Sequence, residues 1–356
     1  MPRVTVLMPV YNGERFIAEA AESVLSQTYG AFELLVVDDG STDGTRDVLA
    51  SVKDPRLIVV HNEANVGLAR TLNRGLSLAR GEYVAHHDAD DVSEPMRLIH
   101  QVSHLDADSS IALVGSDYTK IDEASAWLGD RSLPVEPAHI AWALAFYCPI
   151  VHSAVTYRRR VVLDVGGYDV RYAYSPDYDL WSRLAANHRL ASVRLPLVRY
   201  RIRHDSLTAT IGESSGEGRR VAVRNATALL AFSGRTLPDA AEHQAMHGVV
   251  TGTEVPEDGA SIAVAFERIL HMLDAFCLHP VFSAAETLAV RADVRLALSR
   301  RLVDCIDRFD AATFARLRSL VSGDDPWFAI LAALPLQQSA RVFWKTAMAQ
   351  WTERHR

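Results

Sequence analysis

The stretch GEYVAHHDADD, residues 81–91, joins a short apolar run to an acidic end. Its aromatic and β-branched residues predict a buried strand over Glu82–His87, so that Asp88–Asp91 follow directly at its carboxyl end. A second apolar run, Leu34–Val37, ends in the same way in Asp38–Asp39. Because the carboxyl ends of parallel strands meet at one edge of a sheet, this pattern predicts an acidic site at that edge.

Strand and helix patterns alternate along the first half of the chain. The predicted strands are Val4–Met8, Leu34–Val37, Leu57–His61 and Glu82–His87, and the predicted helices are Glu14–Gln27, a helix capped by Thr42 or Asp43 and ending near Val52, and Val66–Arg80. This repetition predicts an α/β fold, with a Rossmann-like, mainly parallel sheet flanked by helices. The section from Leu113 to Thr210 is less regular, with strands near Val151–Tyr157 and Ala191–Ile202 and a helix beginning near Asp177.

Composition changes near Gly212–Gly218, which resembles a linker. All later segments have helical patterns, at Arg220–Phe232, Asp239–Val249, Ile262–Leu278, Ala284–Arg300, Ala311–Leu320 and Ala340–Glu353. We therefore expect an α/β domain at residues 1–212 and an all-α domain at residues 219–356. The amphipathic tail Arg341–Arg356 fits a helix docked on the protein's own core, which the pattern favours, or a helix on a membrane surface.

Charge and cysteine content exclude several classes of protein. The formal net charge is −7, which argues against a nucleic-acid partner. The 3 cysteines, Cys148, Cys277 and Cys305, are too scattered for a disulfide framework or a zinc cluster. Met1–Val10 has a strand pattern and no signal-peptide pattern, and no apolar run is long enough to span a bilayer. We expect a cytoplasmic protein, and peripheral contact with the inner face of the membrane stays open.

Asp88 and Asp90 are two residues apart, just past a strand, and can share one divalent cation. Mg²⁺ and Mn²⁺ prefer such oxygen ligands and share them with phosphate oxygens. Taken alone, the pair also fits an acidic loop that caps the next helix. Asp39 can accept a hydrogen bond from a uracil ring or a ribose hydroxyl, or can be a helix cap. Tyr11, in a turn stiffened by Pro9, can stack on a flat base or lie at the edge of the core.

Taken together, these motifs resemble the N-terminal half of family 2 glycosyltransferases, which have the GT-A fold. The matching segments are Met8–Gly13, Val36–Asp43, Asn65–Arg70 with Asn73 and Gly75, Gly81–Val84 and Asp88–Asp91. These motifs occur in the family's order and at family-like spacing, which makes the match highly specific. The resemblance covers about the first 210 residues and carries no information on the helical remainder.

The resemblance implies a role for each residue of the donor site. Tyr11 would pack on the nucleotide base and Asp39 would bond to it, with Pro9 and Asn12 as further substrate-binding residues. Arg70 would lie near the nucleotide or its phosphates, Asp88 would lie by the ribose and the metal, and Asp90 would hold the Mn²⁺ or Mg²⁺ ion. His86 and His87 depart from the family, which usually has apolar residues there. A histidine at this place can add a metal ligand or a hydrogen bond. We expect one partly buried histidine and one that faces a neighbouring helix.

The acceptor half resembles the family over about Pro149–Thr208. In that alignment Asp177 is the catalytic base, Pro176 replaces the usual glutamate, and Asp179 is the competing assignment for the base. An acceptor hydroxyl must lose its proton as it attacks the anomeric carbon, and a single displacement inverts that carbon with one base. At a helix N-terminus, Asp177 is expected to stay ionised.

The segment around Arg203 resembles one that supplies a histidine near the metal and the diphosphate. Arg203 occupies the usual histidine position and His204 lies one place later. Arg203 can bind the diphosphate by its charge, and His204 can be a metal ligand. The sequence does not choose between them, and both side chains can also be solvated.

The sequence therefore predicts an inverting, metal-dependent glycosyltransferase. It would move a sugar from a nucleotide-diphosphate sugar, with UDP favoured, to a saccharide, glycolipid or polysaccharide acceptor. One alternative is a non-catalytic GT-A-like scaffold or binding protein. A less favoured alternative is a sugar nucleotidyltransferase, which would have a Gly-rich, Arg-containing loop after the first strand. The oligomeric state stays open.

Overall fold

The computed structural model describes residues 1–206, 216–231 and 239–322. The chain divides into two compact units, Met1–Val221 and Ala222–Arg356. The predicted helix Ala340–Glu353 and the amphipathic tail Arg341–Arg356 lie outside the described residues. Most of the predicted linker lies outside them too, so the domain limits drawn at residues 212 and 219 stay a prediction.

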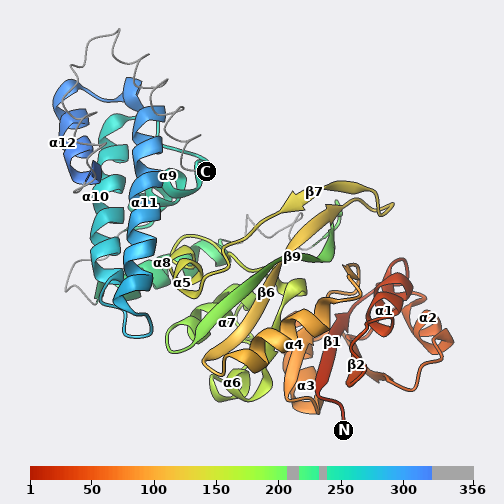
Figure 1. Ribbon diagram of the computed structural model, residues 1–356. Coiled ribbons are helices and arrows are strands. Elements are labelled where there is room, and N and C mark those ends of the chain that lie inside the picture. The colour runs from red at the N-terminus through yellow and green to blue at the C-terminus, as the bar shows by residue number, and fades with distance from the viewer. Residues whose placement is uncertain (207–215, 232–238, 323–356) are drawn as a thin grey trace. The chain divides into compact units, whose positions relative to one another are not determined.

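The first unit alternates strands and helices (Figure 1). Its elements are β1 (Val4–Val10), α1 (Ile17–Leu25), β2 (Phe32–Asp38), α2 (Thr45–Ser51), β3 (Leu57–His61), α3 (Leu68–Leu78), β4 (Tyr83–His86), β5 (Val92–Ser93), α4 (Arg97–Ala107), β6 (Ile111–Ile121), β7 (Trp127–Arg131), α5 (Pro137–Ala143), the 3-10 helix η1 (His152–Ala154), β8 (Thr156–Arg158), α6 (Arg159–Asp164), α7 (Pro176–Ala185) and β9 (Arg189–Arg201). Helix α8 (Glu217–Ala231) begins in this unit.

All strands belong to one sheet, in the order β3-β2-β1-β4-β8-β6-β9-β5, with β7 paired to β6. Strands β1 to β4 run parallel to one another, as the sequence predicts. Strand β8 is antiparallel to both β4 and β6, and β6 and β9 form a long parallel pair. The α/β class with flanking helices is thus confirmed, and the antiparallel strands of the second half make the complete sheet mixed.

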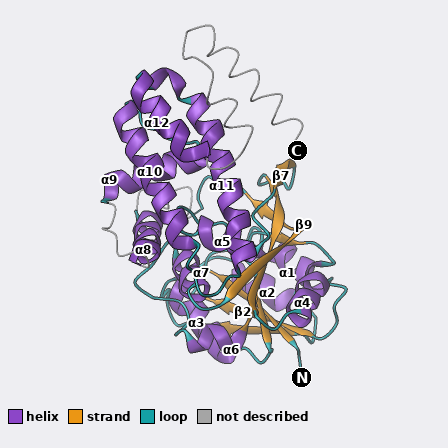
Figure 2. Cartoon of the chain, turned by 60° about the vertical axis from the view of Figure 1, so that its left-hand side comes forward, coloured by secondary structure: helices purple, strands orange, loops and turns teal. Residues whose placement is uncertain are grey.

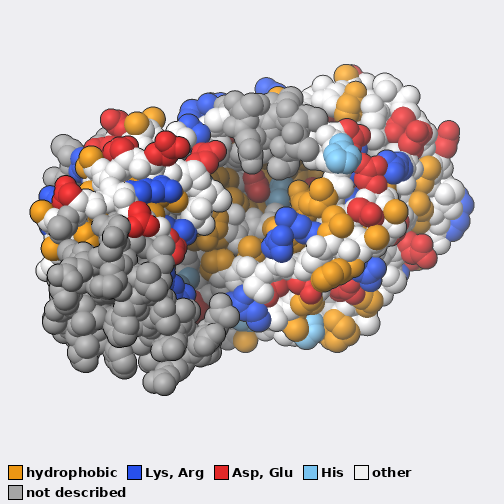
Figure 3. Space-filling model, turned by 90° about the horizontal axis from the view of Figure 1, so that it is seen from above, with side chains coloured by type: hydrophobic (Ala, Val, Ile, Leu, Met, Phe, Trp, Pro, Cys, Tyr) orange, Lys and Arg blue, Asp and Glu red, His pale blue; other side chains and the backbone are white. Residues whose placement is uncertain are grey.

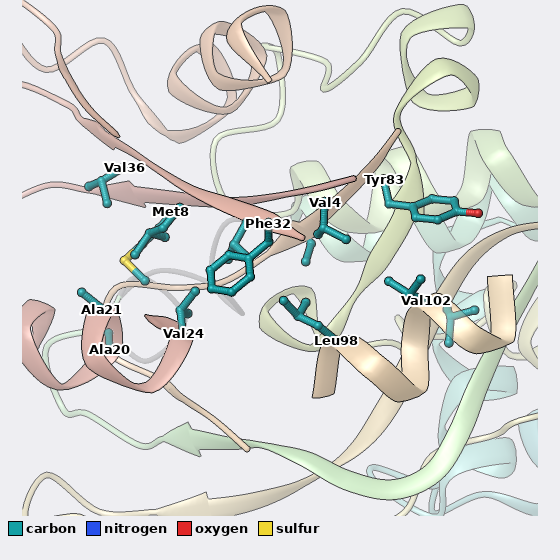
Figure 4. Close-up of a cluster of buried hydrophobic side chains, with 14 of the residues drawn as sticks. Val4, Met8, Ala20, Ala21, Val24, Phe32, Val36, Tyr83, Leu98 and Val102 are labelled. Carbon is teal, nitrogen blue, oxygen red and sulfur yellow. The ribbon is translucent and has the colours of Figure 1, made fainter. Parts of the chain in front are cut away.

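One face of the sheet packs on helices α1 and α4 (Figure 4). Val4, Met8 and Val36 point from the strands toward Val24 of α1 and Leu98 of α4, and all five side chains are buried. Each buried side chain of this kind stabilises the fold by roughly 1.5–3 kcal/mol relative to its exposed state. The alternation of side chains along β1 therefore fixes which residues face this core.

The opposite face of β1 packs on α3. Leu7 points to this side, and an added Cβ at Gly75 would lie 2.2 Å from its Cδ1 atom. Glycine at position 75 therefore allows α3 to approach the sheet closely. Helix α3 is joined to the carboxyl end of β3 by a short loop. The packing of α3 on the sheet therefore also places the start of this helix beside the carboxyl ends of the strands.

The second unit contains only helices among its described residues (Figure 2). After α8 these are α9 (Ala240–Thr251), α10 (Gly259–Phe276), α11 (Ala284–Asp304), the 3-10 helix η3 (Ile306–Arg308) and α12 (Ala311–Ser322). Asp239 and Asp258 cap α9 and α10 through hydrogen bonds from the backbone N–H groups of Glu242 and Ser261. The helices predicted between Arg220 and Leu320 are present, with their ends shifted by a few residues.

Candidate active site

A cavity of about 1280 Å³ lies where the carboxyl ends of β1, β2 and β4 meet the end of β9. The predicted site residues that line it are Pro9, Tyr11, Asn12, Asp39, Arg70, Asp88, Asp90, Asp177 and Arg203. His204 is exposed and does not line the cavity, whereas its neighbour Arg203 does. The structure therefore brings together all but one of the residues chosen from the sequence.

Asp39 is buried directly after β2 and organises one wall of the cavity. Its carboxylate accepts hydrogen bonds from Nδ2 of Asn62 at 2.6 Å and from the backbone N–H groups of Val66 at 3.0 Å and Gly67 at 2.9 Å. Gly40 follows with φ +74°, and a Cβ there would lie 2.6 Å from the carbonyl carbon of Ala64. Only glycine fits this turn, which holds Asp39 beside the loop that leads to Arg70.

Asp38 is fully buried beneath this turn and has a structural role. Burial alone would raise the pKa of its carboxyl group, but hydrogen bonds from Ser41, His61 and Arg46 outweigh burial and lower the pKa to about 2. The two neighbouring aspartates therefore differ in role. Asp38 fixes the turn from inside, and Asp39 faces the cavity.

Tyr11 is 49% exposed and lies in the turn after β1. Asn12, with φ +51°, fixes this turn to the one after β2. The backbone N–H of Asn12 donates to Oγ of Ser41 at 2.9 Å, and its Oδ1 atom accepts from the backbone N–H of Thr42 at 2.8 Å. The hydrogen bonds of Asn12 thus fix the turn, and the exposed Tyr11 ring is accessible for stacking on a flat base.

The turn Asp88–Asp91 is fixed at its first residue by two contacts. Nε2 of His86 lies 2.9 Å from Oδ1 of Asp88, and the backbone N–H of Asp88 donates to Oγ of Ser153 at 3.0 Å. Within the described part of the chain, no side chain donates a hydrogen bond to Oδ2 of Asp88 or to Oδ1 of Asp90. Burial raises the pKa of both carboxyl groups, and for Asp90 the proximity of Asp88 raises it further. Two free carboxylate oxygens in one turn suit a hard divalent cation, which would keep both groups ionised.

A buried arginine supports this turn from the protein interior. Arg97 of α4 is 1% exposed, and its guanidinium donates to the backbone carbonyl groups of His86 at 2.7 Å and Val155 at 3.0 Å. It also lies 3.1 Å from Nδ1 of His87. Asp91 is equally buried, and burial raises its pKa well above the usual value. The acidic turn therefore rests on a buried positive charge.

The end of β9 supplies two arginines to the cavity. The buried Arg201 donates to the backbone carbonyl of Asp90 at 2.7 Å and to Oε2 of Glu19 at 2.7 Å. Arg203 donates to Oδ2 of Asp90 at 2.9 Å. The guanidinium carbons of Arg201 and Arg203 lie 4.6 Å and 5.3 Å from the centroid of the Phe16 ring, which stabilises both by cation–π contact.

Asp177 lies in the first turn of α7 and lines the cavity. Burial raises the pKa of its carboxyl group to about 6, although backbone hydrogen bonds at the helix N-terminus act in the opposite direction. Desolvation thus outweighs these backbone hydrogen bonds, although a carboxyl group with this pKa is still mostly ionised near neutral pH, as the sequence predicts. Asp179, the competing assignment, is 1% exposed and accepts from Nε of Arg183 at 2.8 Å, so it belongs to an internal ion pair.

The loop before Asp177 is held by Glu217, the first residue of α8. The Glu217 carboxylate accepts hydrogen bonds from the backbone N–H groups of Ala173 at 3.1 Å, Tyr174 at 2.8 Å and Ser175 at 3.0 Å. Glu217 is 6% exposed, so water cannot readily replace these bonds. One carboxylate therefore fixes the segment that leads into α7.

Several cavity residues were not singled out from the sequence as site residues. They include Phe16, Tyr118, Lys120, His152 and Tyr200. Tyr118 and Lys120 lie on β6, a strand that the irregular pattern did not reveal, and Tyr200 lies on β9 beside Lys120. His152 lies within the segment that resembles the acceptor half of the family. A signal for β6 was available in the apolar run at residues 111–114.

Comparison with known proteins agrees with this arrangement. Residues 5–165 match the family described as Glycosyl transferase family 2. EpsE of Bacillus subtilis, whose name describes a glycosyltransferase, is 36% identical over 210 residues, which are 58% of this chain and 74% of EpsE. The chain belongs to glycosyltransferase family 2. The sequence-based assignment and its expectation of a glycosyltransferase are confirmed.

Two further proteins are similar to this chain. WfaP of Escherichia coli, named as a UDP-Glc:alpha-D-GlcNAc-diphosphoundecaprenol beta-1,3-glucosyltransferase, is 30% identical over 210 residues, or 59% of this chain and 81% of WfaP. The crystal structure of S. aureus TarS 1-349 in complex with UDP-GlcNAc has a TM-score of 0.53 at 17% identity, over 99% of this chain and 92% of that one. That similarity shows that the present chain has the same fold as the TarS structure.

The surface and helices of this glycosyltransferase add two observations. On the face drawn in Figure 3, acidic and basic side chains are intermixed and no large area of one sign is visible. None of the helices in the described ranges is long and apolar enough to cross a bilayer.

Proposed function

We propose that this glycosyltransferase transfers a sugar from a nucleotide-diphosphate sugar, with UDP as the favoured nucleotide, to a hydroxyl group of a saccharide, glycolipid or polysaccharide. The observation that carries the proposal is the convergence of Asp39, Asp88, Asp90 and Asp177 on one cavity. The E. coli relative, whose name gives UDP-Glc as donor and a lipid-linked sugar as acceptor, supports this choice of substrates.

The nucleotide would bind at the carboxyl ends of β1 and β2. Tyr11 would stack on the base, beside Pro9 and Asn12, and Asp39 would accept a hydrogen bond from the base or the ribose. Three donors already hold the Asp39 carboxylate in place. A preorganised acceptor of this kind reduces the entropy lost on binding. Arg70, whose side chain is exposed, would contact the nucleotide or its phosphates.

A divalent cation, Mn²⁺ or Mg²⁺, fits the free oxygens of Asp88 and Asp90. Such an ion would neutralise the charge that develops on the departing diphosphate. Arg203 would contribute a second positive charge at the same place, since it is held by Asp90 at 2.9 Å. The exposed position of His204 favours Arg203 over His204 as the residue that meets the diphosphate.

Asp177 would act as the general base. It would accept the proton of the acceptor hydroxyl as that oxygen attacks the anomeric carbon, while the nucleoside diphosphate leaves from the opposite face. One displacement of this kind inverts the anomeric carbon. A carboxyl pKa of about 6 suits this role, because the group is mostly ionised near neutral pH and is still basic enough to accept a proton.

A donor screen by thermal shift tests the proposal. We expect UDP with Mn²⁺ to raise the melting temperature, and GDP, dTDP and CMP to have smaller effects. The shift should disappear in Asp39→Ala and Asp90→Ala and persist in Asp177→Asn, which should bind UDP but transfer no sugar. The absence of a shift with every nucleotide would contradict the proposed donor site.

A further inference from the structure

His86 occupies a position where an apolar side chain would fit more simply. The residue is completely buried, and its Nδ1 atom has no hydrogen-bond partner in the described part of the chain. A buried polar atom that has lost its water without gaining a partner destabilises the folded protein. The structure therefore corrects the expectation of one partly buried histidine, because His86 and His87 are both completely buried, and the cost of burying His86 requires an explanation.

His86, Asp88 and His152 each have a possible ligand atom within 4.8 Å of those of the other two. The ring geometry excludes a metal site formed by these three residues. The rings of His86 and His152 are stacked, with centroids 3.5 Å apart and an angle of 12° between their planes. Each nitrogen lone pair lies in the plane of its own ring, and the planes of two stacked, nearly parallel rings do not meet close to the rings, so both rings cannot place a lone pair on one ion.

The contacts of His86 indicate another role. Its Nε2 atom lies 2.9 Å from Oδ1 of Asp88, and an ionised carboxylate can only accept, so Nε2 carries the proton and donates. The ring is held in place by the stack on His152, whose own Nε2 atom lies 3.0 Å from the hydroxyl oxygen of Tyr168. In this tautomer Nδ1 of His86 carries no proton and therefore donates no hydrogen bond.

We propose that His86 is a positioning residue for the donor site. It holds Oδ1 of Asp88, so that the carboxylate keeps one orientation and Oδ2 remains available to the metal–diphosphate complex. The proposal rests on the proposed function. Residues that orient a metal ligand through a hydrogen bond typically contribute a factor of about 10–100 in metal affinity or activity.

The test compares two substitutions of the same residue. His86→Leu fills the space but donates no hydrogen bond, whereas the side-chain amide of His86→Gln can place a donor near the position of Nε2. We expect His86→Leu to weaken the binding of UDP in the presence of Mn²⁺ by about tenfold or more, measured by calorimetry. His86→Gln should restore most of this affinity. Binding of UDP in EDTA should be the same in both variants and in the native protein.

Controls separate positioning from a general structural effect. His100→Leu, on α4 and away from the cavity, should bind UDP with Mn²⁺ like the native protein. Native affinity for UDP with Mn²⁺ in His86→Leu would overturn the proposal. Equal weakening of UDP binding with Mn²⁺ and in EDTA would also overturn it, because that result means that the substitution disturbs the nucleotide site itself. If the native protein itself binds no UDP with Mn²⁺, the proposed function fails, and this proposal fails with it.

Discussion

Nη1 of Arg203 lies 2.9 Å from Oδ2 of Asp90, so the second carboxylate of the acidic turn is paired with a cation of the protein itself. The same guanidinium donates to both oxygens of Asp205 at 3.0 Å. The side chain of Arg203 is 21% exposed, so this charge is only partly screened by water. A positive charge is thus held at the site proposed for the diphosphate before any substrate binds.

Substitution of Arg203 should slow transfer. We expect Arg203→Met to lower kcat by about 10²-fold, because the departing diphosphate loses a preorganised positive partner. Arg203→Lys should be intermediate, since lysine keeps the charge but loses the planar fork. Initial rates at saturating donor measure the effect, with Arg160→Met, an exposed arginine of α6, as the control. An unchanged kcat in Arg203→Met would remove Arg203 from the mechanism.

The pH dependence of transfer should reveal Asp177. The base must be ionised to accept a proton, and burial raises its pKa to about 6. We therefore expect kcat/KM to fall about tenfold per pH unit below about pH 6 and to level off above it. UDP affinity must be measured over the same range, because Asp88 and Asp90 also have raised pKa values. Residual turnover in Asp177→Asn with an unchanged pH profile would contradict the assignment.

Tyr11 should act on donor affinity alone. Stacking of an aromatic ring on a base contributes roughly 1–3 kcal/mol. Tyr11→Ala should therefore raise the KM for the donor about tenfold and leave kcat nearly unchanged, while Tyr11→Phe, which keeps the ring, should stay near the native value. A fall in kcat with no change in KM would place Tyr11 at the reacting atoms and not at the base.

Removal of Arg97 should destabilise the fold. Arg97→Met leaves the carbonyl groups of His86 and Val155 without their donor and removes the positive charge beneath Asp91. Disruption of such a buried charged network typically costs about 3–5 kcal/mol. Urea denaturation should show this loss in the free energy of unfolding, and the exposed Arg160→Met should change it by less than about 0.5 kcal/mol. Equal midpoints for the two variants would mean that Arg97 is not a structural support.

The strand-end residues of the donor half could be predicted because their signals are local. Apolar runs that end in carboxylates are enough to place Asp39, Asp88 and Asp90 at one edge of the sheet. Helix ends were less accurate. Helix α1 begins at Ile17 and not at Glu14, after a turn in which the Gly13 carbonyl accepts from the N–H groups of Phe16 and Ile17 and the Glu14 side chain accepts from the backbone N–H of Gly44.

Features that depend on distant packing could not be predicted. The strand expected at Val151–Tyr157 is a 3-10 turn followed by β8, because this segment places Ser153 against the acidic turn. The raised pKa of Asp177 likewise follows from the surroundings of the helix and not from the helix itself. The full burial of His86 follows from its stack on His152, a residue that lies far away in the sequence.

The three hydrogen bonds to Glu217 have a practical consequence for work with the isolated catalytic unit. A recombinant fragment ending at residue 212, the limit drawn from composition, would lack the carboxylate that holds Ala173–Ser175. The loop that delivers Asp177 would then lose its anchor, and the fragment would underestimate the rate of the enzyme. A fragment that extends through Val221 keeps the Glu217 carboxylate. The position of the C-terminal end, over a few residues, therefore decides whether the fragment keeps the transfer rate of the full chain.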